Sequence, residues 1–187
     1  MSRAALPVFA LFALVAACKS PSSTASNEVE VRVSSNVTWP KVDAIDKYTL
    51  RSYPNEFSSI VSDTPMPVLL PKGITFSDPM LIAKGEYYAF SGRAILNGQP
   101  DANYTVHATK LAHEYPGAKL AEATVPMRGT KGYITINEGI RVASWSENGV
   151  AYSVDIECTR EDDIQCSEEA HILNVVNNLA YVGGRGR

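Results

Sequence analysis

The sequence of 187 residues lacks the short motifs that mark common catalytic sites. It contains no Gly-x-Ser-x-Gly, no His-Glu-x-x-His and no phosphate-cradling glycine loop. The segment from Arg128 to Gly132 holds glycines and cations, but it lacks the length and order of a P-loop and indicates a turn. The sequence therefore assigns no catalytic residue, no metal ligand and no cofactor.

Strong charge of either sign is also lacking. The chain has 17 basic and 20 acidic side chains, for a formal net charge of −3, and it has no basic run, heptad stretch or internal repeat. This balance argues against nucleic acid or an anionic membrane face as the main partner. The length fits one domain large enough to bury a core.

A hydrophobic run long enough to cross a bilayer is missing as well. The longest apolar stretch covers residues 4–17, whereas a spanning helix needs about 20 apolar residues. With Arg3 in front of it, the stretch has the length and flanks of a secretory leader. We therefore expect residues 1–17 to be a signal peptide.

The leader ends in Val15-Ala16-Ala17-Cys18, which resembles the lipobox of bacterial lipoproteins. The resemblance implies that the Cys18 sulfur receives a diacylglyceryl group and that the chain is cut before Cys18. Such an anchor would hold the protein on a membrane, because two or more acyl chains bind firmly. In that family an Asp after the cysteine resembles an inner-membrane signal, so Lys19 implies the outer membrane, facing the periplasm. An ordinary signal peptide with a stray Cys18 thiol is the alternative.

A polar segment follows the anchor. Residues 19–27 read KSPSSTASN and contain no large apolar side chain. Such a segment cannot bury enough surface to offset its ordering entropy. We expect residues 18–27 to form the lipidated cysteine and a flexible tether, and residues 28–187 to form one globular domain.

Cys158 and Cys166 remain as an even pair once Cys18 is acylated, and an exported protein meets oxidising conditions. A bridge between them would close a loop of nine residues and stabilise the fold by about 2.6 kcal/mol. The sequence favours this disulfide, with a redox-active pair or a metal site as alternatives. No His pair or second Cys pair lies near enough in sequence to complete a zinc site.

The C-terminal third shows the clearest strand pattern. Apolar and polar residues alternate from Val150 to Cys158, and Asn148-Gly149 before it suits a type I′ turn. Further strands are predicted at 28–34, 87–96, 104–111, 132–136 and 140–146, with an extended proline-bounded segment at 65–71. The predicted fold class is α+β: an antiparallel meander with a C-terminal helix packed on one face.

Two helices are predicted. The C-terminal helix has Ser167 as its N-cap and Gly183-Gly184 as its end. Its apolar stripe consists of Ile172, Leu173, Val176, Leu179 and Ala180. A shorter helix is predicted over 55–62, with Phe57, Ile60 and Val61 facing inward.

The segment from Trp145 to Tyr152, together with Ser167-Glu168-Glu169 and residues 172–179, resembles the closing motif of a bacterial extracytoplasmic domain family. In that family a strand with Trp, a turn with Gly, a strand with Tyr and a terminal helix end the domain. The resemblance covers about 40 residues and implies the fold only, because the activity of the family is mostly uncharacterised. The segment between Cys158 and Cys166 departs from the usual short connection.

The polar and aromatic side chains leave two alternatives open. We expect His107, His113 and His171 to have surface or hydrogen-bonding roles. The aromatic residues of the central strands fit core packing, or else a tyrosine patch for a partner: Tyr87, Tyr88, Phe90, Tyr104 and Tyr115. The expected function is a non-catalytic binding module for an envelope protein or cell-wall partner. A structural or regulatory part of an envelope complex is the first alternative, and an envelope enzyme is the second.

Overall fold

The computed structural model describes residues 31–96, 99–114, 121–160 and 163–185. The leader, Cys18 and the tether lie outside these residues, as do Asn97-Gly98 and Tyr115. The predictions of a lipid anchor and of a flexible tether therefore stay predictions.

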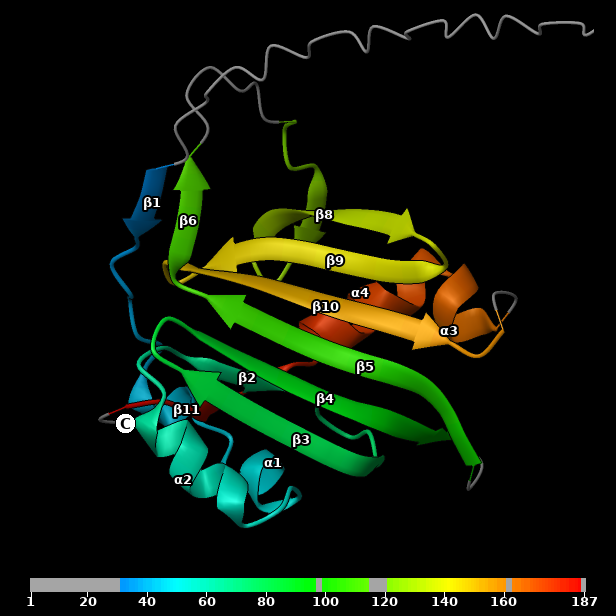
Figure 1. Ribbon diagram of the computed structural model, residues 1–187, viewed down its shortest axis with the longest axis horizontal. Coiled ribbons are helices and arrows are strands. Elements are labelled where there is room, and N and C mark those ends of the chain that lie inside the picture. Colours follow the sequence, from blue (N-terminus) through cyan, green and yellow to red (C-terminus); the bar gives the residue numbers. More distant parts are fainter. Residues whose placement is uncertain (1–30, 97–98, 115–120, 161–162, 186–187) are drawn as a thin grey trace, which may run out of the picture.

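A seven-stranded antiparallel sheet dominates the fold (Figure 1). Its strands are β3 (Phe76–Lys84), β4 (Tyr87–Leu96), β5 (Gln99–Thr109), β7 (Val125–Met127), β8 (Thr130–Asn137), β9 (Ile140–Glu147) and β10 (Val150–Cys158). The order across the sheet is β3-β4-β5-β10-β9-β8-β7. The predicted meander is confirmed for β8, β9 and β10. The whole sheet joins two meanders through the pair β5–β10, which connects strands far apart in the sequence.

Two short strand pairs accompany the large sheet. β1 (Val31–Ser34) pairs with β6 (Leu111–Glu114), and β2 (Val68–Leu70) pairs with β11 (Ala180–Gly183). The predicted strand over 104–111 is in fact divided between two strands, because the strand is interrupted at Lys110. The Lys110 backbone N–H donates to the Glu86 carbonyl, and the Thr109 hydroxyl accepts from the Leu111 N–H.

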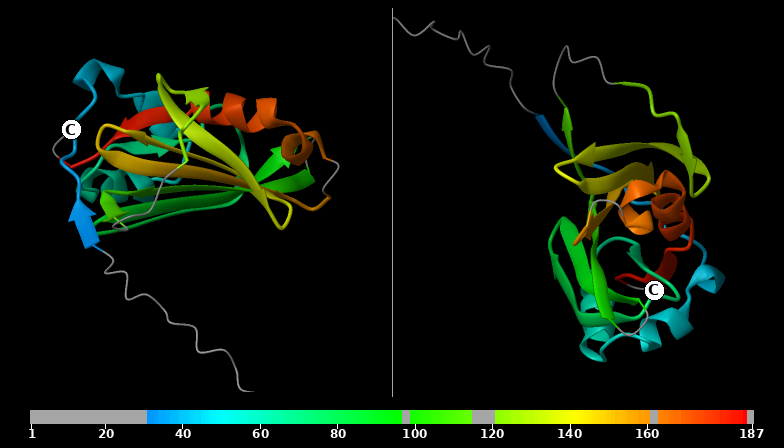
Figure 2. Two further views of the ribbon diagram at one scale, coloured as in Figure 1. Left: turned by 90° about the horizontal axis from the view of Figure 1, so that it is seen from above. Right: turned by 90° about the vertical axis from the view of Figure 1, so that its right-hand side faces the viewer.

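The helices lie together on one side of the large sheet (Figure 2). They are the 3-10 turn η1 (Val42–Ala44), α1 (Lys47–Arg51), α2 (Glu56–Asp63), α3 (Ile164–Ser167) and α4 (Glu169–Asn177). Asp46 caps α1 by accepting a hydrogen bond from the Thr49 N–H at 2.9 Å. The contact of Lys72 with Asp46 and this cap lower the pKa of Asp46 to about 2. The α+β class is confirmed.

The end of the chain differs from its prediction. Helix α4 stops at Asn177, and residues 180–183 form strand β11, all four of them buried. A continuation of the helix would have left β2 without a partner strand. Ser167 is the last residue of α3, and Glu168 rather than Ser167 is the N-cap of α4. The Arg141 guanidinium donates to the Cys166 and Ser167 carbonyls at 2.7 and 2.8 Å.

The core lies between the large sheet and the layer formed by the helices and the β2–β11 pair. Alternate residues of each central strand face this layer, so the period-two pattern of the sequence places them inside. Aromatic rings fill the centre of the core, with Tyr53, Phe57, Phe76, Phe90 and Tyr104 in mutual stacked or edge contacts. Most of one side of the sheet is therefore used for packing.

Candidate functional site

The side of the large sheet away from the helices carries no helix among the described residues, and we call it the open face (Figure 2). A row of directly opposed residues crosses it: Ile82 on β3, Ala89 on β4, His107 on β5, Ser153 on β10, Ser144 on β9 and Tyr133 on β8. Residues two positions along each strand point to the same side. The register therefore defines which side chains share the open face.

Large apolar side chains are exposed on the open face. Ile82 is 56% exposed and Tyr133 is 38% exposed, and these two residues end the row. Met80 and Tyr87, each two positions from a member of the row, are 63% and 43% exposed. These four are most of the large apolar residues that the described chain leaves exposed.

An ion pair lies near the middle of the open face. His107 Nε2 is 3.5 Å from Asp155 Oδ2, and both side chains are partly exposed. The Asp155 carboxylate raises the pKa of His107, against a smaller lowering by burial. The second carboxylate oxygen, Oδ1, is shielded from solvent and accepts no hydrogen bond in the described structure. The charge of this pair therefore changes when the His107 imidazole gains or loses a proton.

A polar hollow of about 560 Å³ lies along the open face beside this pair. Arg93 donates to the Asn103 amide oxygen at 3.3 Å, and the Asn103 amide donates to Glu157 at 3.2 Å. These three side chains come from β4, β5 and β10, which are neighbours in the sheet. Gly92 and Tyr104 also line the hollow, and the other lining residues carry hydroxyls or a further carboxylate: Ser77, Asp78, Ser91 and Thr105.

The open face also brings a serine, a histidine and an aspartate close together. Ser153 lies directly opposite His107, and Asp155 is two positions further along β10. An activated serine needs a hydrogen bond to its base. Between the described Ser153 and His107 side chains the structure has no such bond, and the imidazole contacts the carboxylate instead. As it stands, the arrangement does not activate Ser153.

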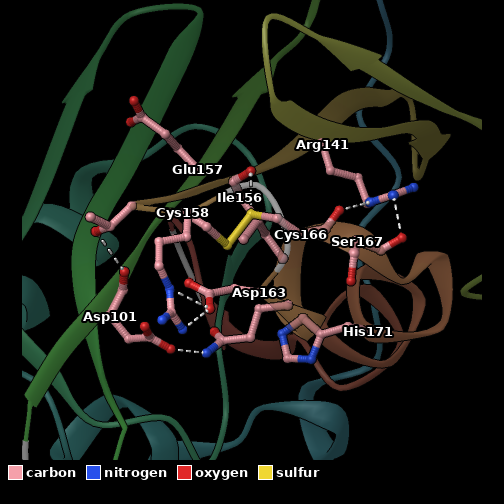
Figure 3. The surroundings of a disulfide bond; sticks show 12 residues. Asp101, Arg141, Ile156, Glu157, Cys158, Asp163, Cys166, Ser167 and His171 are labelled. Atoms are coloured by element: carbon pink, nitrogen blue, oxygen red, sulfur yellow. Dashed lines mark hydrogen bonds and ion pairs between the residues drawn. A yellow bond between two sulfur atoms is a disulfide. The ribbon is translucent and has the colours of Figure 1, made fainter.

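Cys158 and Cys166 are joined by a disulfide that links the end of β10 to α3 (Figure 3). Beside it, the Tyr104 hydroxyl donates to Gln165 Oε1 and contacts His171 Nε2, both at 2.7 Å. Because the hydroxyl has a single proton, His171 is the donor in the second contact. Burial lowers the pKa of His171, opposed by a weaker effect of Glu168. The neutral imidazole that results suits a structural hydrogen bond.

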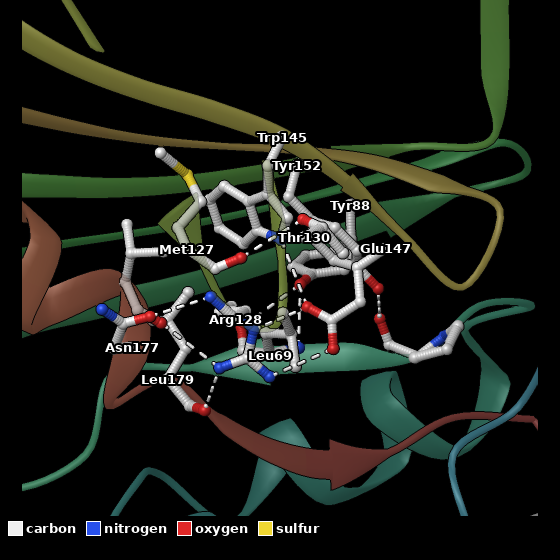
Figure 4. A network of polar contacts seen from close by, with 12 residues as sticks. Leu69, Tyr88, Met127, Arg128, Thr130, Trp145, Glu147, Tyr152, Asn177 and Leu179 are labelled. Carbon is white, nitrogen blue, oxygen red and sulfur yellow. Dashed lines mark hydrogen bonds and ion pairs between the residues drawn. The ribbon is translucent and has the colours of Figure 1, made fainter. Parts of the chain in front are cut away.

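A second polar cluster surrounds Arg128 at the turn between β7 and β8 (Figure 4). Its Nε donates to Glu147 Oε2 at 2.6 Å, and its Nη1 donates to the Leu179 carbonyl at 2.7 Å and the Val176 carbonyl at 3.2 Å. Trp145 Nε1 donates to the same Glu147 carboxylate at 3.2 Å. Arg128 therefore ties the end of α4 to the sheet, which is a structural role.

The described residues settle several predictions. The aromatic residues Tyr88, Phe90 and Tyr104 are buried, which confirms core packing for these three, whereas Tyr87 is exposed on the open face. His107 lies on the polar side, as expected, and His171 makes a hydrogen bond. The side chain of His113 lies outside the described part of the structure.

Sequence reasoning missed the partners of these residues. It gave His107 a surface or hydrogen-bonding role but did not find Asp155, which lies on a strand that is adjacent only in the folded sheet. Arg93 and Glu157 were missed for the same reason. The turn at Arg128 was recognised, and both Arg128 and Gly129 have positive φ, but the charged contacts were not.

Among the described helices, none is long and apolar enough to cross a membrane. Across the described ranges, no group of three His, Cys, Asp or Glu side chains is arranged to hold a metal ion. No family model matches this chain, and neither the curated proteins nor the solved structures give a significant match. The two resemblances stated for the sequence therefore stay predictions.

Proposed function

We propose that this protein is an exported lipoprotein, anchored through Cys18 in the bacterial cell envelope, that binds a protein partner on its open face without catalysing a reaction. The leader and the lipobox-like Val15-Ala16-Ala17-Cys18 support the anchor, and Lys19 favours the outer membrane. The disulfide between Cys158 and Cys166 agrees with an oxidising compartment.

The composition of the open face carries the proposed binding role. Protein interfaces are enriched in aromatic residues, Met and Arg at their centre, with polar groups around them. The open face combines the exposed Met80, Ile82, Tyr87 and Tyr133 with hydroxyls and charged pairs. Met80, Ile82 and Tyr87 lie on the neighbouring strands β3 and β4, whereas Tyr133 lies across the sheet on β8. Neighbouring exposed apolar side chains are typical of interaction sites. Most of the opposite side of the sheet packs into the core.

Crosslinking in living cells tests the binding role. A photoreactive phenylalanine analogue replaces Tyr87 or Tyr133 on the open face, and Tyr48 on α1 serves as the matched control. Tyr48 is 83% exposed, so it is at least as accessible as the other two. We expect a discrete crosslinked partner from Tyr87 and Tyr133 and none from Tyr48. The same result at all three positions, or at none, would contradict a role of the open face.

The anchor is tested separately by Cys18→Ser. The variant should leave the membrane fraction and appear in the soluble envelope fraction, because the thioether cannot form on an oxygen. A variant that stays in the membrane fraction to the same extent as the parent would refute lipidation at Cys18.

A further inference from the structure

β3 is an edge strand of the large sheet, since β4 is its single neighbour in the described structure. The first half of its free edge is disrupted. Asp78 has a φ of 48°, Pro79 has no N–H to donate, and the register with β4 shifts between Ser77 and Met80. Bulges and prolines are common devices that prevent unwanted strand pairing.

The second half of the same edge has none of these devices. From Met80 to Lys84 the strand pairs regularly with β4, and no backbone hydrogen bond joins it to any other described segment. In an antiparallel strand, alternate backbone N–H and C=O groups point away from the neighbouring strand. Met80, Ile82 and Lys84 make the backbone hydrogen bonds to β4. Leu81 and Ala83 therefore present unused backbone donors and acceptors at the edge.

A groove runs along this open half of β3. It has a volume of about 540 Å³, and every residue from Leu81 to Glu86 lines it. Ile60 and Asp63 of α2 form part of the other wall, and α2 lies beside β3 in Figure 1. Because the groove runs parallel to β3, an extended peptide lying in it would be aligned as an additional strand of the sheet.

The side chains of the groove favour an acidic occupant. Three cations line it, and one of them, Lys110, is 3.2 Å from the Glu86 carboxylate. Lys84 and Arg185 remain against the single carboxylate of Asp63, so the groove is positive in a chain of net charge −3. Complementary charge guides partners to such a surface and sets their orientation.

We infer that the free edge of β3 from Met80 to Lys84 takes up an extended, acidic segment of the partner protein as an additional strand. This inference rests on the proposed binding function and names how the partner attaches. Backbone hydrogen bonds to β3 hold the segment, and its acidic side chains contact Lys84 and Arg185. On the open face, its side chains cover Met80 and Ile82, which are 63% and 56% exposed.

Peptide display on the processed, acylated protein in detergent tests this attachment. A random library of 12-residue peptides is panned against the protein, and the enriched peptides are measured for affinity and for amide hydrogen exchange. We expect acidic sequences that slow exchange at Leu81 or Ala83, whose N–H groups point away from β4. No enrichment, or protection confined to other segments, would overturn the inference. A dimer of the protein without peptide that protects the same amides would also overturn it, because a second copy would then be the occupant.

Two controls separate strand addition from simple charge attraction. The best peptide is made with N-methyl groups on either its odd or its even amides. Only one of these sets faces β3, so one methylated peptide should lose binding and the other should keep it. Equal binding by both would refute strand addition.

Charge is tested by Lys84→Glu combined with Arg185→Glu, and Lys47→Glu on α1 is the matched control. The double variant should bind an acidic peptide with roughly tenfold lower affinity at low salt, and the control variant should keep the affinity of the parent. A double variant that binds acidic peptides as well as the parent would remove the argument from charge. If the edge fails these tests while Tyr87 and Tyr133 still crosslink a partner in cells, the binding function stands and only the mode of attachment is wrong.

Discussion

Removing the Arg128 side chain should destabilise the domain much more than removing an exposed cation from the same hairpin. Arg128 and Glu147 are 13% and 18% exposed, so their ion pair is largely shielded from water. Breaking one partner of a buried pair costs about 3–5 kcal/mol, because the other charge is left behind. Glu147 keeps the Trp145 hydrogen bond and some contact with water, which favours the lower end of this range.

The carbonyls at the end of α4 add to this loss. Arg128 donates to the carbonyl of Val176 in the last turn of α4 and to that of Leu179, which follows the helix. The Val176 carbonyl also accepts from the Leu179 N–H at 3.2 Å. We therefore expect Arg128→Met to lower the free energy of unfolding by about 3 kcal/mol. For a domain of this size, that corresponds to a fall in Tm of about 6–12 °C.

Lys131→Met is the matched control for this prediction. Lys131 lies on β8, 3.9 Å from Glu122, and the two side chains are 63% and 85% exposed. Exposed pairs of this kind contribute about 0–1 kcal/mol. Urea unfolding with the disulfide intact gives the change in the free energy of unfolding for each of the two variants. If Arg128→Met destabilises the domain no more than Lys131→Met, the Arg128 network has no energetic role. A double-mutant cycle with Glu147→Gln should show that the effects of the two residues are not additive.

Local alternation predicted the strands whose two sides differ in polarity. The bounds of β4 and β10 follow directly from it, because each strand buries every second residue against the core and leaves the others on the open face. β3 was missed, since Asp78 and Pro79 break the alternation where the strand bulges. β11 was read as the end of a helix, because all four of its residues are buried and no period distinguishes the two structures. These residues form a strand because they pair with β2, which lies far earlier in the chain.

The candidate site was harder to predict than the fold. The sequence indicates a surface or hydrogen-bonding role for His107, but Asp155 becomes its partner through the pairing of β5 with β10, which no local pattern encodes. The groove at β3 depends in the same way on segments that are distant in sequence, since α2 and Arg185 supply its far wall. Polar residues on one side of a strand could at most have suggested that this side is exposed.

Four further predictions concern the disulfide and the histidines. Replacing Cys158 and Cys166 together by Ala should lower the free energy of unfolding by about 2.6 kcal/mol, measured with urea; an unchanged midpoint would mean that the bridge does not restrict the unfolded chain. Proton NMR titration should place the pKa of His171 below 6.5 and that of His107 above it, and the reverse order would contradict the contacts described. These shifts act on stability with opposite signs. Because the folded pKa of His171 is lowered, the unfolded chain takes up that proton first, and stability falls as the pH drops below 6.5. His171→Gln should remove this acid-side loss. The raised pKa of His107 stabilises the fold below pH 6.5, and this contribution disappears as the pH rises through the folded pKa. His107→Gln should therefore weaken the domain at pH 5.5 but not at pH 8.5, and a loss of equal size at both would show that the contact with Asp155 is not electrostatic.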